Sequence, residues 1–151
     1  MWRMGMAAAM VGLLLVGCNF HVSGPSNNPA LNRVAEENFR DLAREEDDRV
    51  LARMSSANSR ETVKAALPTL REIIGPTIPG SAVRTEGQII KVTDGTVYVV
   101  VQTFSLSDRY AYVTTRFIPE NRVWKIQGCH INIERKAPAS VTPPSEGATE
   151  T

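Results

Sequence analysis

The sequence is poor in several features that would assign it to a protein class. Of its 151 residues only two are cysteines, too few for the framework of a disulfide-rich domain. The formal net charge is only +1, so the chain lacks the bulk positive field with which many proteins grip nucleic acid. Hydrophobic residues make up 42% and charged residues 22%, as in an ordinary globular protein. We therefore expect one globular domain and no nucleic-acid partner.

Near the amino terminus there is no hydrophobic run long enough to cross a membrane. The run from Met4 to Leu15 has about 12 residues, whereas a spanning helix needs about 20. Arg3 precedes this run and is the only charge before Arg33. A charged start followed by a short apolar run is typical of a secretory signal peptide.

The apolar run ends in Leu15-Val16-Gly17-Cys18, which resembles the lipobox of bacterial lipoproteins. In that family the cysteine thiol receives a diacylglycerol, a peptidase cuts before the cysteine, and the new amino group is commonly acylated as well, for example with palmitate. The resemblance implies that residues 1–17 are a signal peptide and that Cys18 is the lipidation site. Two or three acyl chains anchor a protein stably to a membrane.

The residue after this cysteine is Asn19, not Asp. In Gram-negative lipoproteins, Asp at that position tends to retain the protein at the inner membrane. The resemblance therefore implies a lipid-anchored protein on the periplasmic side of the outer membrane, with the inner membrane as the alternative location. A buried amino-terminal helix with an incidental cysteine is the other interpretation of this segment.

Composition divides the rest of the chain into three segments. Residues 18–28 hold Gly, Pro, Ser and Asn and are predicted to be a lipidated tether. Residues 135–151 contain three prolines, three threonines and no aromatic residue, which predicts a disordered tail. Residues 29–134 remain for a single folded domain, long enough for one hydrophobic core.

The first half of this domain has helical periodicity. Pro29 suits the first turn of a helix, and apolar residues then recur at spacings of three and four. A second short helix follows the acidic run that ends at Asp48, and Asn58 with Glu61 resembles a capping box before a third helix. Pro68 predicts a kink or a break in that third helix. The apolar positions of the first helix are Leu31, Val34, Ala35, Phe39, Leu42 and Ala43.

The second half alternates apolar and polar residues, as antiparallel strands with one covered face do. The predicted strands are residues 82–92, 96–106, 110–118 and 122–134, joined by turns around Asp94-Gly95, Ser107–Arg109 and Pro119–Asn121. Helices followed by a meander indicate an α+β fold. We predict two to three N-terminal helices packed on a curved four-stranded antiparallel meander sheet.

The order of these elements, with Val123-Trp124-Lys125-Ile126-Gln127-Gly128 in the last strand, resembles the nuclear-transport-factor-2-like, cystatin-like cone superfamily. That resemblance implies a pocket between the sheet and the helices. Enzymes of the superfamily, such as ketosteroid isomerases, place acidic, Tyr or His side chains in the pocket, where a carboxyl group can have a raised pKa. No predicted strand carries two carboxylates that face inward together, so this chain departs from the catalytic pattern.

Five residues are weak candidates for a pocket or a partner surface: Tyr98, Tyr110, Tyr112, Trp124 and His130. As a catalytic base His130 would need an orienting acid and a bound substrate, so we favour a histidine satisfied by a neighbour. Cys129 is the only thiol left if Cys18 is acylated, and we favour a buried, unreactive cysteine over a reactive or disulfide-forming one. Adjacent Cys and His do not make a zinc site, and we expect no metal and no cofactor.

Together these features favour a non-catalytic binding or assembly module of the bacterial envelope. Its expected partners are the membrane, through the lipid on Cys18, and either another envelope protein or a second copy of itself. Two alternatives stay open. One is a small-molecule-processing enzyme of the isomerase or dehydratase type, and the other is a structural subunit that forms a homodimer through its sheet.

Overall fold

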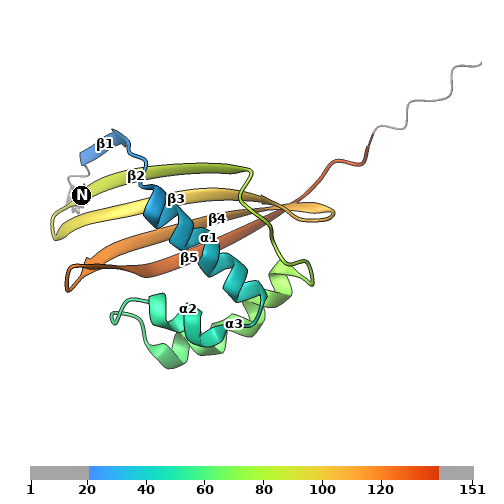
Figure 1. Ribbon diagram of the computed structural model, residues 1–151, viewed down its shortest axis with the longest axis horizontal. Helices are drawn as coiled ribbons and strands as arrows, with labels where there is room; N and C mark the ends of the chain where they lie inside the picture. The colour runs from blue at the N-terminus through green and yellow to red at the C-terminus, as the bar shows by residue number, and fades with distance from the viewer. Residues whose placement is uncertain (1–20, 140–151) are drawn as a thin grey trace, which may run out of the picture.

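A computed structural model of the chain describes residues 21–139. The lipobox, Cys18 and the predicted signal peptide lie outside the described residues, as does the end of the predicted tail. The described chain combines three helices with one antiparallel sheet (Figure 1). In chain order the elements are β1 (His21–Pro25), α1 (Pro29–Ala43), α2 (Asp47–Arg53), α3 (Arg60–Ile74), β2 (Arg84–Val92), β3 (Gly95–Ser105), β4 (Arg109–Glu120) and β5 (Val123–Arg135).

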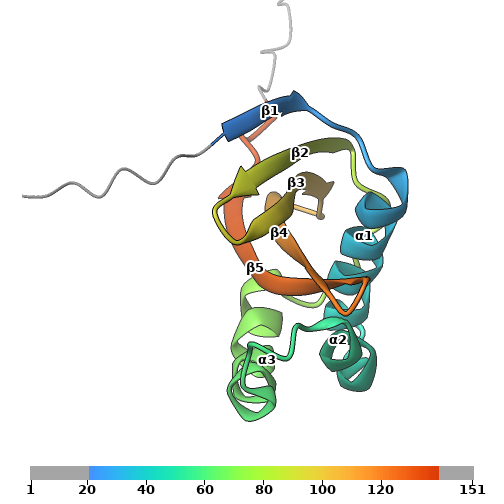
Figure 2. The ribbon, with the colours of Figure 1, turned by 90° about the vertical axis from the view of Figure 1, so that its left-hand side faces the viewer.

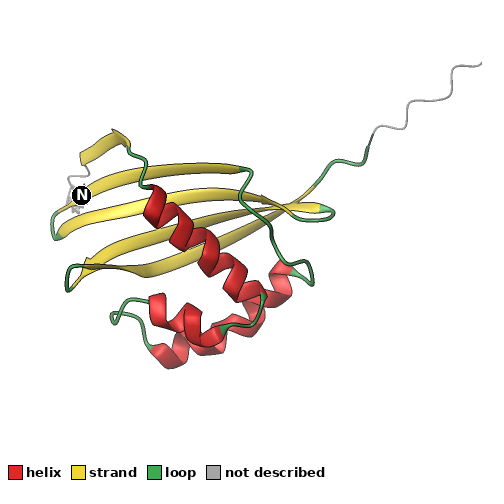
Figure 3. Ribbon diagram, viewed as in Figure 1, coloured by secondary structure: helices red, strands yellow, loops and turns green. Residues whose placement is uncertain are grey.

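The predicted α+β architecture is confirmed. The sheet order is β1-β2-β3-β4-β5, and β2 to β5 form the predicted meander with ends within two residues of the predicted ones. Figure 2 shows the sheet strongly curved, with α1 across its open side and α2 and α3 beside one another. Helices and strands are separated along the chain once β1 is passed, as Figure 3 shows by colour.

Local signals explain where the helices begin. Asn28 caps α1 by accepting a hydrogen bond from the Leu31 N–H at 3.1 Å, and Pro29 takes the first helical position. The cap of α3 is Ser59, whose hydroxyl accepts from the Thr62 N–H. The predicted capping box at Asn58 is therefore wrong by one residue, because the Asn58 amide instead donates to the Gln127 carbonyl.

The predicted break at Pro68 does not occur, since α3 continues through it from Arg60 to Ile74 as one helix; the alternative, a kink within the helix, stays a prediction. Pro68 is exposed and its neighbour Leu67 is buried. Apolar burial of Leu67 and Ile74 on the inner face of α3 favours a continuous helix in spite of the missing N–H group.

The register of the sheet is regular except near its edges. Between β4 and β5 the register shifts after Arg116, which pairs with Gly128, while Phe117 pairs with Ile126. Gln127 is thus an extra residue, a β-bulge, and bulges increase the local bend of a sheet. The carbonyl of this bulge residue accepts the Asn58 amide, so the bulge also ties the sheet to the α2–α3 connection.

The predicted tether is corrected in part. Residues 21–25, within the segment predicted to be a flexible link, form strand β1 antiparallel to β2, with His21 opposite Lys91. The Ser26 N–H then donates to the Gly87 carbonyl before the chain turns into α1. The sheet therefore has a short fifth strand in addition to the predicted four.

The start of the predicted disordered tail is corrected as well. Arg135 belongs to β5, opposite Arg109. The Lys136 N–H donates to the Asp108 carbonyl, and its ammonium group donates to the Leu106 carbonyl at 2.6 Å. These contacts fasten the first residues after β5 to the β3–β4 turn.

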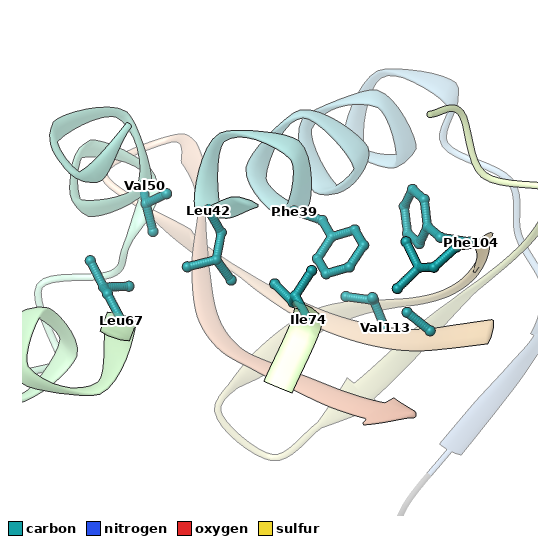
Figure 4. Packing of buried hydrophobic residues seen from close by; sticks show 9 residues of the cluster. Phe39, Leu42, Val50, Leu67, Ile74, Phe104 and Val113 are labelled. Carbon is teal, nitrogen blue, oxygen red and sulfur yellow. The ribbon is translucent and has the colours of Figure 1, made fainter. Parts of the chain in front are cut away.

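The core between sheet and helices consists of two hydrophobic clusters. Cluster A, shown in Figure 4, lies under all three helices, and cluster B lies under the first half of α1. Their buried side chains stabilise the fold by leaving water. Cluster A contains Phe39, Leu42, Val50, Leu67, Ile74, Phe104, Leu106, Ala111 and Val113. Cluster B contains Leu31, Ala35, Tyr98, Val100, Phe117 and Ile126.

Candidate binding site

Polar side chains occupy core positions between the two clusters. Gln102 lies on β3 between Val100 of cluster B and Phe104 of cluster A, and both neighbours are buried. Thr115 occupies the equivalent place on β4, and Asn38 lies one turn after Ala35 on α1. We call these three residues the polar belt (Asn38, Gln102 and Thr115).

The belt is buried and incompletely hydrogen-bonded. Its three side chains are no more than 2% exposed, and within residues 21–139 Asn38 Oδ1 and Gln102 Oε1 have no hydrogen-bond partner. Leaving a buried polar atom without a partner costs about 1–3 kcal/mol. A polar group in such a position commonly meets a water molecule or a ligand, so the belt marks the interior as a candidate binding region.

A hydrogen-bonded network joins one end of the belt to the start of α1. The Tyr98 hydroxyl donates to Asn32 Oδ1 at 2.6 Å and accepts from the Asn28 N–H at 3.1 Å. The Gln102 amide donates to the Asn32 carbonyl at 3.0 Å. These bonds hold the first turns of α1 at a fixed position over β3.

This network requires glycine at position 87. A Cβ atom there would overlap the Tyr98 hydroxyl and would lie 2.7 Å from Tyr98 Cζ and 3.0 Å from the Ser26 carbonyl oxygen. Tyr98 thus crosses β2 over Gly87 to reach α1, which no larger residue at that position would allow without a shift.

A groove opens beside this network, between the first half of α1 and strands β2 and β3. Its volume is about 950 Å³, and Gln102 of the polar belt lies in its lining. Charges of both signs surround it, with Arg33 and Glu36 on α1 and Glu86 on β2. Amide, hydroxyl and valine side chains complete the lining, so the groove suits a ligand that is partly polar and partly apolar.

One wall of the groove is an uncovered strand edge. Pairing of β1 with β2 ends at Pro25 opposite Gln88, whereas β2 begins at Arg84. The Gly87 carbonyl points toward the β1 side, because it accepts from the Ser26 N–H. Backbone groups that point to one side recur every second residue, so those of Thr85 point into the groove. Among the described strands none pairs with Thr85 on that side.

A second, smaller hollow lies near the other end of the belt. It is a cleft of about 210 Å³ between α3, the end of α2 and the bulged part of β5, with Asn38 and Cys129 in its lining. Leu42, Val50 and Leu67 form its buried inner surface. The groove and the cleft share no lining residue.

The surroundings of Cys129 favour its neutral thiol form. Burial raises the pKa of its thiol to about 11, although the neighbouring Thr115 hydroxyl partly opposes the rise. The thiolate is the reactive form of cysteine, so at neutral pH the side chain behaves as a small apolar group. Within residues 21–139 it is a free cysteine.

The predicted site residues lie on two different faces of the sheet. Tyr98 is buried in cluster B, and Trp124 packs against that cluster while half-buried. Tyr110, Tyr112 and His130 point away from the helices, because their neighbours on β4 and β5 with the opposite orientation are in the core. The structure therefore does not bring the five candidates together.

Two of the outward-facing candidates, Tyr110 and Tyr112, have side-chain partners of their own. A hydrogen bond to the Glu134 carboxylate raises the pKa of Tyr112. The Lys136 ammonium lies 5.0 Å from the centre of the Tyr110 ring, a cation–π distance. His130 is exposed and lies opposite Thr114.

Sequence reasoning missed the polar belt, although a signal was present. Asn38 is spaced three residues after Ala35 and four before Leu42, which places it on the apolar face of α1. Gln102 stands in the inward series Tyr98, Val100, Gln102, Phe104. A polar residue at such a position is informative when it lies inside an otherwise apolar face.

Across residues 21–139 there is no group of three or more His, Cys, Asp or Glu side chains placed to hold a metal ion. In the same part of the chain no helix is long and apolar enough to cross a membrane. Comparisons with protein-family models, curated proteins and solved structures find no match to this chain. The resemblances to bacterial lipoproteins and to the cone superfamily therefore stay predictions.

Proposed function

We propose that this protein is a lipid-anchored binding module that faces the periplasm and takes an extended segment of a partner protein of the envelope into the groove beside α1. The observation that carries the proposal is the groove itself, about 950 Å³ in volume, with the edge of β2 in its wall. An extended segment that pairs with a free strand edge gains main-chain hydrogen bonds, and pockets beside the edge select its side chains.

The chemistry of the groove supports a peptide ligand. Gln102 Oε1, in its lining, is an acceptor without a partner in the described part of the chain, which suits the N–H groups of a main chain or a side-chain amide. Arg33 is exposed on one wall and Glu86 on the opposite one. A partner segment with one acidic and one basic side chain would complement both.

The anchor is proposed on separate grounds. The sequence Leu15-Val16-Gly17-Cys18 supports acylation of Cys18 after cleavage of the signal peptide, and Asn19 supports the outer membrane as the destination. Fatty-acid labelling in cells tests this directly. Wild-type protein should incorporate label and Cys18→Ser should not, whereas label on the Cys18→Ser protein would refute the proposed anchor.

The groove is tested by photo-crosslinking in membranes. A photoreactive residue in place of Arg33 reports on the groove, and one in place of Asn132, exposed on the opposite face of the sheet, is the matched control. We expect a reproducible crosslink to one envelope protein from position 33 and not from position 132. Mass spectrometry of the crosslinked peptides identifies the partner segment.

A second variant asks whether the strand edge matters. Thr85→Pro removes one outward N–H group, and proline is tolerated on strand edges. The position-33 crosslink should weaken strongly in this variant while the fold is retained. Crosslinks from position 132 alone, or only between copies of the chain, would overturn the groove as the binding site and favour the exposed sheet face or a homodimer.

A further inference from the structure

The cleft at the far end of the polar belt has the features of a second binding site. Its inner surface is apolar and buried, and α3 contributes Val63, Ala66 and Leu70 to the outer part of its wall. The described residues that line it include no Asp, Glu, Lys, Arg or His. A charged ligand would lose its hydration there without gaining an ionic partner, so the lining selects uncharged molecules.

Asn38 is the feature that distinguishes this cleft from a gap in the packing. Its side chain is 2% exposed and lies in the lining of the cleft, yet among the described residues its Oδ1 atom has no hydrogen-bond partner. A leucine at this position would complete the apolar face of α1 without a polar penalty. The Oδ1 atom is therefore free to accept a hydrogen bond from a molecule in the cleft.

The opposite wall is shaped by the bulge in β5. Gln127, Gly128 and Cys129 line the cleft, and the hydrogen bond from the Asn58 amide to the Gln127 carbonyl, 2.8 Å long, fixes the bulge to the α2–α3 turn. Gly128 has open space where a Cβ atom would lie. One side of the cleft is thus the backbone of the β5 bulge, fixed by the Asn58 hydrogen bond, and the other side is formed by helix side chains. The cleft is therefore largely pre-formed.

The volume limits the size of the ligand. A cavity of about 150 Å³ holds benzene, so about 210 Å³ admits a molecule on the order of ten non-hydrogen atoms. A peptide segment would not fit. We infer that the cleft binds a small uncharged molecule with an apolar body and one hydrogen-bond donor, which the Asn38 carboxamide recognises.

The test uses the full chain and three probes of similar size. Phenol has an apolar ring and a donor, toluene has the ring without the donor, and benzoate carries a charge. Methyl NMR spectra should show phenol perturbing Leu42, Val50 and Leu67, with an affinity about tenfold above that of toluene, the ratio expected for one neutral hydrogen bond. Benzoate should leave these signals unchanged.

Two variants locate the interaction. Asn38→Leu should reduce the phenol-to-toluene ratio to about one, because only the donor contact is removed. Ala66→Phe should fill the outer cleft and abolish binding of both probes, while Thr85→Pro in the groove should leave both affinities unchanged. The comparison of phenol with toluene in the wild-type protein needs no variant, so it tests the inference even if Asn38→Leu fails to fold.

Equal affinities of phenol and toluene in the wild-type protein, or shifts confined to residues outside the cleft, would overturn the inference. An unchanged preference for phenol in a folded Asn38→Leu protein would overturn it as well. None of these outcomes affects the groove, because the two hollows have different linings. Failure to observe the position-33 crosslink would likewise not bear on ligand binding in the cleft.

Discussion

Clusters A and B differ in how they are closed. Cluster A is covered by three helices and is held together by apolar contacts, such as the Phe39 and Phe104 rings with centroids 4.5 Å apart. Its Leu42, Val50 and Leu67 form the inner surface of the cleft. Cluster B is covered by the first half of α1, which is held there by the hydrogen bonds of Tyr98 and forms one wall of the groove. The comparison assigns most of the stability to cluster A, whereas cluster B fixes the position of the α1 wall of the groove.

The largest expected effect is on cluster A. Phe39→Ala should lower the free energy of unfolding by about 3–5 kcal/mol, because it removes a completely buried ring and leaves a cavity. Urea denaturation measures the change. Ile73→Ala is the control, since Ile73 is apolar but 41% exposed, and it should change stability far less. Similar losses in the two variants would contradict the assigned role of cluster A.

The next effect is on the closure of cluster B. Gly87→Ala should cost about 2–3 kcal/mol, because the added methyl group displaces the Tyr98 hydroxyl and breaks its bonds to α1. Gly80→Ala is the matched control, since nothing lies within 4 Å of a Cβ atom at position 80. A Gly87→Ala protein as stable as the control would show that Tyr98 does not depend on this glycine.

Tyr98→Phe isolates the hydroxyl from the ring. The variant keeps the ring in cluster B but loses the bonds with Asn32 and Asn28, so we expect a loss of about 1–2 kcal/mol. Hydrogen exchange should accelerate in the first turn of α1 and remain slow in α3. Equal acceleration in both helices would contradict the conclusion that the Tyr98 hydrogen bonds stabilise cluster B independently of cluster A.

The smallest expected effect is a shifted titration at the border of cluster A. Alkylation of Cys129 in the folded protein should reach half its maximal rate near pH 11, whereas in denaturant it should do so near the ordinary value of 9.0. Because burial favours the neutral thiol, the contribution of the buried thiol to the free energy of unfolding is complete below pH 9. That contribution declines as the pH rises toward 11. Peptide mass spectrometry follows Cys129 separately from Cys18, and equal profiles in the two states would refute its burial.

Much of the fold could be predicted because its signals are local. Alternation along β2 to β5 and the proline at the first position of α1 depend only on neighbouring residues. Strand β1 was missed because it contains Gly24 and Pro25 and is formed by pairing with β2, more than 60 residues away. Such pairing leaves little trace in a short segment.

The candidate site was harder to predict for the same reason. Periodicity shows that Asn38 and Gln102 point inward, but not that each borders a different hollow. The aromatic residues attracted attention by type, although Tyr110 and Tyr112 lie on the outer face and only Tyr98 reaches the groove network. Polar residues in apolar series were the better signal.

Strand β1 also changes how an acylated protein would stand on its membrane. Only Asn19 and Phe20 lie between Cys18 and the first residue of the sheet, and three extended residues span no more than about 11 Å. His21 lies opposite Lys91, near the β2–β3 turn. A domain on a flexible ten-residue tether could face in any direction, whereas this short link would hold the β2–β3 turn near the lipid headgroups. The domain would then have a fixed height above the membrane and a preferred tilt relative to it.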